Sequence, residues 1–169
     1  MKVSLVQMNS QNVKAANLKK AEELIRRAAA DERPDLIVLP EYYAFLGDGP
    51  VSMHDSAEVF PDGDSYRLMS SLAKELKVTL HAGSVVERVG NVHYNTTLVF
   101  DPEGKEIARY RKIHLFDVDV PGGASYRESD SVARGKDIVT YKVGDKTVGC
   151  AICYDIRFPE LFQALRDRN

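Results

Sequence analysis

The feature that most constrains the fold is an apolar run that leads directly into a helix start. Residues 147–153 (TVGCAIC) are almost entirely apolar and lie between Gly144-Asp145 and a polar stretch. Such a run predicts a strand that is buried on both faces, in a sheet covered by other layers. Residues 158–161 (FPEL) then predict the first turn of a helix, where proline and an acidic residue are both favoured.

Cys153 lies where this strand ends and the helix is about to begin. Backbone N–H groups and the positive end of a helix dipole both favour the thiolate form of a cysteine. We therefore interpret Cys153 as a nucleophile. The alternative is a core thiol, because free cysteine is among the most buried residue types.

Composition and charge limit the class of protein. The 169 residues are enough for one domain with a substantial core, and 44% hydrophobic and 28% charged residues are typical of a globular protein. A net charge of −2 gives no reason to expect binding to nucleic acid or to an anionic membrane. No apolar stretch is long enough to span a membrane, and the two cysteines without an export signal predict a cytoplasmic protein.

The chain reads as alternating strands and helices, which predicts the α/β class with a mixed sheet. Residues 2–7, 13–30 and 36–39 predict strand, helix and strand, hence a parallel pair. The remaining predicted elements are a helix over 64–76 and strands over 78–86, 92–100, 105–110, 138–143 and 146–153, with long loops over 42–63 and 111–136. Residues 1–169 are expected to form a single domain that is incomplete at its C-terminus, because the last helix has no recognisable cap.

Four polar residues stand at predicted strand ends or in the loops beyond them, where ligand crevices form in α/β sheets. They are Glu41, Lys112, Glu128 and Cys153. A cysteine with a carboxylate base and a cation for the developing oxyanion would complete a covalent hydrolase site. Each also has a structural interpretation, as a turn cap, a surface cation, a solvated acid or a core thiol.

The sequence does not favour a disulfide, a metal site or a nucleotide cofactor site. Cys150 and Cys153 form a Cys-x-x-Cys pattern, but residues three apart in a strand point to opposite faces, which disfavours a disulfide. The four histidines have no paired ligand spacing, so no metal is expected. No glycine-rich nucleotide motif is present, so no cofactor is expected.

Three segments resemble the signature motifs of the nitrilase superfamily of carbon–nitrogen hydrolases, and they occur in the family's order. They are residues 39–41 (LPE), 110–115 (YRKIHL) and 153–161 (CYDIRFPEL). Residues 3–8 (VSLVQM) resemble the opening strand, and residues 112–120 (KIHLFDVDV) are most similar to the Nit branch, which includes ω-amidase. The resemblance implies an α-β-β-α sandwich, of which this chain covers roughly the N-terminal part.

The resemblance also implies roles for individual residues. Glu41 would be the general base, Lys112 the oxyanion stabiliser, Cys153 the nucleophile and Glu128 a positioning residue. The backbone N–H of Tyr154 would be a second oxyanion donor. From the residues alone, Arg157 could bind a substrate carboxylate or pair with a nearby acid, and Tyr42 could line the pocket or pack in the core.

The expected activity is hydrolysis of a small ω-amide through a cysteine thioester, without metal or cofactor. A nitrilase or N-carbamoyl amino acid hydrolase using the same residues is one alternative, and an inactive binding or assembly module is another. The helix starting at Phe158 contributes to the dimer interface in the resembled family, so a homodimer is expected.

Overall fold

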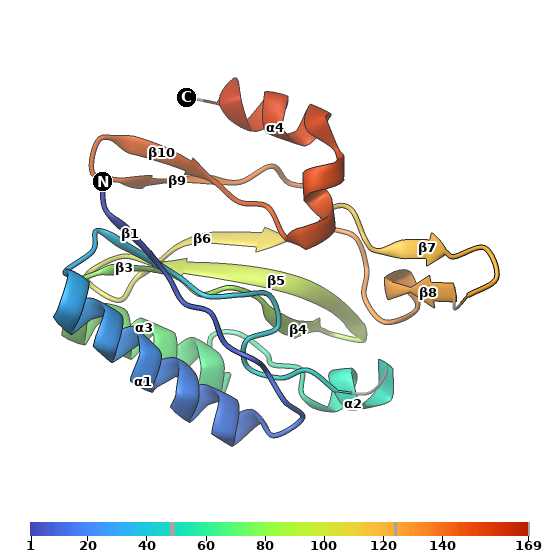
Figure 1. The fold of residues 1–169 in the computed structure, drawn as a ribbon, viewed down its shortest axis with the longest axis horizontal. Coiled ribbons are helices and arrows are strands. Elements are labelled where there is room, and N and C mark those ends of the chain that lie inside the picture. Colours follow the sequence, from blue (N-terminus) through green and yellow to red (C-terminus); the bar gives the residue numbers. More distant parts are fainter. Residues whose placement is uncertain (48–49, 124, 169) are drawn as a thin grey trace.

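The computed structural model describes residues 1–47, 50–123 and 125–168 (Figure 1). Its helices are α1 (Lys14–Glu32), α2 (Pro50–Asp55), α3 (Asp64–Leu76) and α4 (Pro159–Arg166), with 3-10 turns η1 (Glu128–Asp130) and η2 (Cys153–Arg157). Its strands are β1 (Val3–Leu5), β2 (Leu36–Val38), β3 (Thr79–His81), β4 (Val85–Val89), β5 (Val92–Phe100), β6 (Glu106–Arg111), β7 (Asp117–Asp119), β8 (Ser125–Arg127), β9 (Thr140–Val143) and β10 (Lys146–Gly149).

A mixed sheet forms the centre of the molecule. β1, β2 and β3 are parallel neighbours, and β5 pairs antiparallel with β3, β4 and β6. The predicted strand–helix–strand unit at the N-terminus is confirmed, with Val3 opposite Leu36 in the parallel pair. The predicted hairpin near Gly90 is also confirmed, because Val89 pairs with Val92.

The layers follow the order α-β-β-α, in agreement with the nitrilase-like expectation (Figure 1). Helices α1 and α3 cover one face of the central sheet, and a core of α1, α3 and sheet residues such as Ile25, Met69 and Leu80 fills the space between them. The β9–β10 hairpin covers the other face through a second core that includes Tyr110, Tyr141 and Ile152. Helix α4 lies beyond this hairpin (Figure 1).

The strand predicted over 146–153 is shorter and less buried than expected. β10 ends at Gly149, and Thr147 and Val148 are only partly buried. The reason is local: the N–H of Cys150 bonds to the Val139 carbonyl, and the N–H of Ile152 bonds to the Asp155 side chain instead of to a neighbouring strand. Within this apolar run, Cys150 and Ile152 are the residues that are buried in the core.

Three other predictions need correction. The segment over 78–86 is two strands, β3 and β4, separated at Gly83, which has a φ of +43°. The predicted loop over 42–63 contains α2, and the one over 111–136 contains the β7–β8 hairpin and η1. These elements have only three to six residues each, too few to show a hydrophobic period. Asp48 and Gly49 of the first loop lie outside the described residues.

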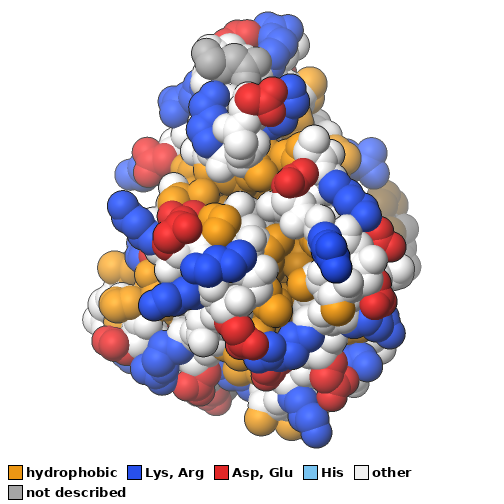
Figure 2. All heavy atoms as spheres, turned by 90° about the vertical axis from the view of Figure 1, so that its left-hand side faces the viewer, with side chains coloured by type: hydrophobic (Ala, Val, Ile, Leu, Met, Phe, Trp, Pro, Cys, Tyr) orange, Lys and Arg blue, Asp and Glu red, His pale blue; other side chains and the backbone are white. Residues whose placement is uncertain are grey.

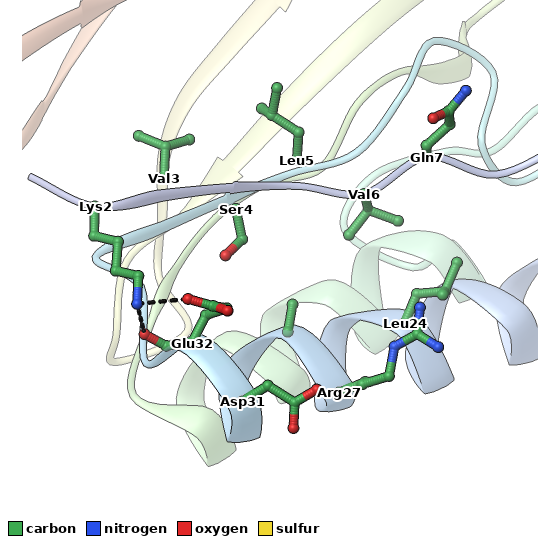
Figure 3. Close-up of a pocket in the computed structure, with 11 residues that line it drawn as sticks. Lys2, Val3, Ser4, Leu5, Val6, Gln7, Leu24, Arg27, Asp31 and Glu32 are labelled. Atoms are coloured by element: carbon green, nitrogen blue, oxygen red, sulfur yellow. Dashed lines mark hydrogen bonds and ion pairs between the residues drawn. The ribbon is translucent and has the colours of Figure 1, made fainter.

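The edge strand β1 leaves part of its surface open. A groove of about 470 Å³ separates it from α1, and Lys2 closes one end through a 2.6 Å contact with Glu32 (Figure 3). Val3 and Leu5 point away from α1 and are 41% and 77% exposed (Figure 3). On the same side of the molecule, hydrophobic side chains are visible between charged ones (Figure 2). Among the described helices, none has the length and apolar character needed to cross a membrane.

Candidate active site

Cys153 begins the 3-10 turn η2 in an unusual backbone conformation. Its φ is +46°, a left-handed value that is uncommon for residues other than glycine. The preceding residue, Ile152, is buried, whereas Cys153 itself is exposed. A strained conformation persists only where the surrounding structure fixes it, and such strain is concentrated at functional sites.

Asp155 holds the Cys153 segment and the Lys112 segment together. This carboxylate is completely buried and accepts hydrogen bonds from the Tyr110 hydroxyl at 2.7 Å and from the Ile152 N–H at 2.9 Å. It also contacts the backbone N and Nδ1 of His114, at 3.0 and 2.7 Å. The His114 ring stacks on Phe158, with ring centroids 3.7 Å apart. His114 therefore has a structural role in this geometry.

Lys112 is the centre of a buried charged network. Only 2% of its side chain is exposed, and Nζ lies 3.0 Å from Glu41 Oε1 and 2.9 Å from Glu128 Oε2. Burial alone would lower the pKa of Lys112, but the attraction of Glu41 and the hydrogen bonds with Glu128 raise it overall. The cation is thus stable next to two carboxylates that come from distant segments of the chain. We call Glu41, Lys112 and Glu128 the charged triad.

Further contacts fix the carboxylates of the charged triad. Asn95 Nδ2 donates to Glu41 Oε1 at 2.8 Å and to Glu128 Oε1 at 3.2 Å. Glu128 also accepts the Tyr42 hydroxyl at 3.2 Å and the Phe116 N–H at 2.7 Å. Burial, followed by the charge of Glu128, raises the pKa of Tyr42, so that this hydroxyl is a donor.

The segment that carries Glu41 is fitted tightly against the break between β3 and β4. A Cβ atom at Gly83 would lie 2.0 Å from the Pro40 carbonyl oxygen, so only glycine fits there. On the next residue, Ser84 Oγ accepts the Tyr42 N–H at 3.1 Å, and Tyr42 has a left-handed φ of +51°. The break in the predicted strand is therefore what holds Glu41 at the edge of the sheet.

The prediction that the helix start favours a Cys153 thiolate is wrong. Although the residue as a whole is exposed, partial desolvation of its thiol raises the pKa of Cys153, and the charge of Glu41 raises it further, while Lys112 acts in the opposite direction. Helix α4 begins only at Pro159, so its N-terminus does not adjoin the sulfur. The thiol is neutral at rest and needs a base to form the nucleophile.

The two remaining predicted residues lie in η2. The N–H of Tyr154 belongs to the first turn of η2, where amides have no partner within the helix. Its ring makes an edge contact with Phe116, at a centroid distance of 5.0 Å. Arg157 ends η2 and is exposed, and no ion pair of Arg157 is found in the part of the chain that the structure describes. Arg157 is therefore not part of the charged triad or of the contacts that fix it.

A hollow of about 360 Å³ lies beside the triad, bordered by Tyr42 and Glu128. Its apolar lining comes from Leu46, Met53 and Val132, among other residues. Of the charged triad, only Glu128 lines this hollow, and Cys153 is not among its lining residues. Within residues 1–47, 50–123 and 125–168, no group of three or more His, Cys, Asp or Glu side chains could hold a metal ion.

Two important residues were missed by the sequence interpretation. Asn95 stands among other polar residues of β5 (VHYNTTLVF), so nothing in its local sequence distinguishes it from the two threonines that follow it. Asp155 is part of the segment quoted for its resemblance, but nothing in its spacing indicates that it bonds to Tyr110 and His114. Both act through contacts between segments that are distant in sequence.

Comparisons with known proteins agree with this geometry. The sequence profile of the family described as carbon-nitrogen hydrolase matches residues 2–169. Hydrolase C26A3.11 of Schizosaccharomyces pombe is 42% identical over 161 residues, which are 95% of this chain and 49% of that protein. Omega-amidase NIT2 of Danio rerio is 39% identical over 163 residues, which are 96% of this chain and 57% of the relative.

Solved structures agree with the fold assignment. The structure of Saccharomyces cerevisiae Nit3, described as a member of branch 10 of the nitrilase superfamily, superposes with a TM-score of 0.86 at 31% identity. That match covers 99% of this chain and 60% of Nit3. The chain thus spans about half to three fifths of the relatives named here.

Proposed function

Because the chain belongs to the carbon–nitrogen hydrolase family, we propose that it carries the catalytic centre of an enzyme that hydrolyses small linear amides. The observation that carries this proposal is the charged triad beside an exposed cysteine with a strained backbone. The triad provides a carboxylate base and a fixed cation, and the cysteine provides the nucleophile. These are the components that covalent amide hydrolysis requires.

The first half of the reaction forms a thioester. Glu41 removes the thiol proton while the sulfur of Cys153 attacks the amide carbon. The carbonyl oxygen becomes an oxyanion, which Lys112 Nζ and the N–H of Tyr154 stabilise. Glu41 then returns the proton to the amide nitrogen, the C–N bond breaks, and ammonia leaves.

The second half releases the acid. Glu41 takes a proton from a water molecule, which attacks the thioester carbon, and the same donors stabilise the second oxyanion. The C–S bond breaks, the sulfur of Cys153 recovers its proton, and the carboxylic acid departs. Glu128 acts through Lys112, whose Nζ it holds at 2.9 Å. No metal or cofactor takes part in this scheme.

The substrate class is proposed from the relatives. Several of the most similar ones are named omega-amidases, from fish, frogs and mammals, which supports an ω-amide that carries a carboxylate. Arg157 is exposed at the end of η2, the 3-10 turn that begins with the nucleophile, and is proposed to bind that carboxylate. We also propose a cytoplasmic location, since a reactive exposed thiol is compatible with a reducing compartment.

Ammonia release from a panel of small amides, nitriles and N-carbamoyl amino acids tests the proposal. The assay uses this chain and a version extended past Asn169 to the length of its relatives. We expect release from amides, and a loss of about a thousandfold or more in Cys153→Ala. The matched control is Cys150→Ala, since Cys150 is buried and is not part of the scheme.

Three results would contradict the proposal. Full activity in Cys153→Ala would remove the nucleophile from the scheme. Release from nitriles or carbamoyl compounds alone would assign the same residues to another reaction of the family. Absence of any release in both lengths of chain would favour the binding or assembly module.

A further inference from the structure

Asn95 contacts each member of the charged triad from a completely buried position in β5. Its side-chain nitrogen lies 2.8 Å from Glu41 Oε1 and 3.2 Å from Glu128 Oε1. Its backbone carbonyl accepts the Lys112 N–H at 2.9 Å. One residue of the central sheet therefore links three loop segments that are distant in sequence.

The side-chain amide of Asn95 has only one favourable orientation. Turned over, Oδ1 would face two carboxylates and repel them. In the observed orientation Oδ1 is buried, and no partner for it is found among the described residues. A buried oxygen without a hydrogen bond lowers stability. An apolar residue of similar size would suit the packing better, so the presence of asparagine is explained by its two donor hydrogens.

The donor hydrogens of Asn95 help to fix the orientation of the Glu41 carboxylate. Its Oε1 is engaged by both Asn95 Nδ2, at 2.8 Å, and Lys112 Nζ, at 3.0 Å. Both of these donors fall on the same oxygen, and the Cys153 thiol is within hydrogen-bonding reach of the Glu41 carboxylate. Two donors on one oxygen restrict rotation of the carboxylate and leave the second oxygen available for a proton.

We propose that Asn95 is a positioning residue that orients Glu41 so that Oε2 is the base for the Cys153 thiol. The same amide lies between the carboxylates of Glu41 and Glu128 and reduces their mutual repulsion around Lys112. This inference rests on the proposed function for its effect on amide hydrolysis. Its effect on the thiol itself can be measured without any substrate.

Alkylation of Cys153 by iodoacetamide provides that measurement, with the site identified by peptide mass spectrometry. The reaction forms a C–S bond, expels iodide, and transfers the thiol proton to Glu41 and then to solvent. We expect Asn95→Leu to react about tenfold more slowly near pH 7, where the neutral thiol depends on its base. At a pH high enough to ionise the thiol without a base, the variant and the unmodified chain should react at similar rates.

Two further variants make the test specific. Asn95→Asp keeps the shape of the side chain but replaces its donors with an oxygen, so it should be slowed in the same pH-dependent way. The matched control is Thr96→Val. Thr96 is as buried as Asn95 but faces away from the triad and donates to Glu87 Oε2 at 2.8 Å. We expect its alkylation rate to stay unchanged at both pH values.

Several outcomes would overturn the proposal. They are an unchanged rate in Asn95→Leu near pH 7, a slowing of equal size at both pH values, and failure of both Asn95 variants to fold, as judged by circular dichroism. In the extended chain, the variants should lower kcat for an amide by about tenfold with little change in KM. If the alkylation results hold and the unmodified enzyme hydrolyses no amide, the proposed function fails and the role of Asn95 stands.

Discussion

Two ionisable side chains that are shielded from water, Lys112 and His81, differ in their charge state in the folded protein. Lys112 keeps its charge in a buried position because Glu41 and Glu128 lie within 3.0 Å of Nζ. For His81, in contrast, no carboxylate partner is found among the described residues, and Nδ1 contacts the hydroxyl of Tyr141 at 2.9 Å. Burial lowers the pKa of His81 to about 4. The histidine is therefore neutral in the folded protein at neutral pH.

This difference predicts how stability depends on pH. In the unfolded chain His81 binds a proton near about pH 6.5, whereas in the folded chain its pKa is about 4. Because the unfolded state binds the proton more readily, His81 should reduce the free energy of unfolding by up to about 3 kcal/mol as the pH falls through this window. Urea unfolding at several pH values, compared with His81→Leu, measures the effect.

The variant should lose less stability over the same pH range, because it has no group to protonate at this position. The difference between the two proteins should appear only below about pH 6.5. Parallel curves for the two proteins would show that His81 is protonated equally in both states, contrary to its position at the end of β3 against Tyr141 of β9.

At the scale of elements, the sequence predicted those that have a clear hydrophobic period or an apolar run. The strand–helix–strand unit over 2–39 and the hairpin around Gly90 are of this kind. The same logic placed Glu41 and Lys112 near one another, since both follow strands of one sheet. The short elements α2, β7 and β8 have no such signal.

What could not be predicted depends on contacts across the sheet. The role of Asn95 requires two carboxylates from other segments to meet its amide, and nothing local in β5 indicates this. The neutral state of Cys153 likewise depends on burial and on Glu41, while the sequence indicated only a nearby helix start. Local rules identified the residues, and tertiary contacts determine their chemistry.

The break between β3 and β4 gives a prediction at this scale. In Gly83→Ala the new Cβ would lie 2.0 Å from the Pro40 carbonyl oxygen, at a φ of +43°. We expect a loss of about 3 kcal/mol or more in the free energy of unfolding, because backbone must move to relieve the contact. Gly90→Ala is the matched control, since Gly90 also has a positive φ but open space around it.

The control should lose only about 1 kcal/mol, the usual cost of a left-handed conformation in a residue with a side chain. Urea unfolding of both variants gives the comparison. Equal losses would mean that the Glu41 segment shifts freely and that the break does not fix it.

At the scale of the whole molecule, the outer face of α4 and the end of η2 carry exposed apolar residues. The inner side of α4 is buried through Leu161. The outer side has a hollow of about 450 Å³ lined by Ile156, Pro159 and Phe162, together with two polar residues. Ile156 is 72% exposed and Phe162 is 41% exposed. Contiguous exposed apolar residues of this kind are typical of interaction sites.

We propose that a second copy of the chain covers this face, as the resemblance of the α4 segment to a dimerising helix suggests. In a two-fold dimer the same patch meets itself, so one substitution acts twice. Phe162→Glu should therefore yield a monomer, because two unpaired carboxylates would be buried in the contact. Light scattering over a range of protein concentrations measures the mass.

Val59→Glu is the control that separates loss of this contact from a general effect of added charge. Val59 is 44% exposed, close to the value for Phe162, but it precedes α3 in the opposite layer of the sandwich. We expect Val59→Glu to remain a dimer at concentrations where Phe162→Glu is monomeric. A dimer that survives in Phe162→Glu would place the interface elsewhere. A mass that equals the monomer at every concentration in the unmodified chain would leave the α4 face without a second copy.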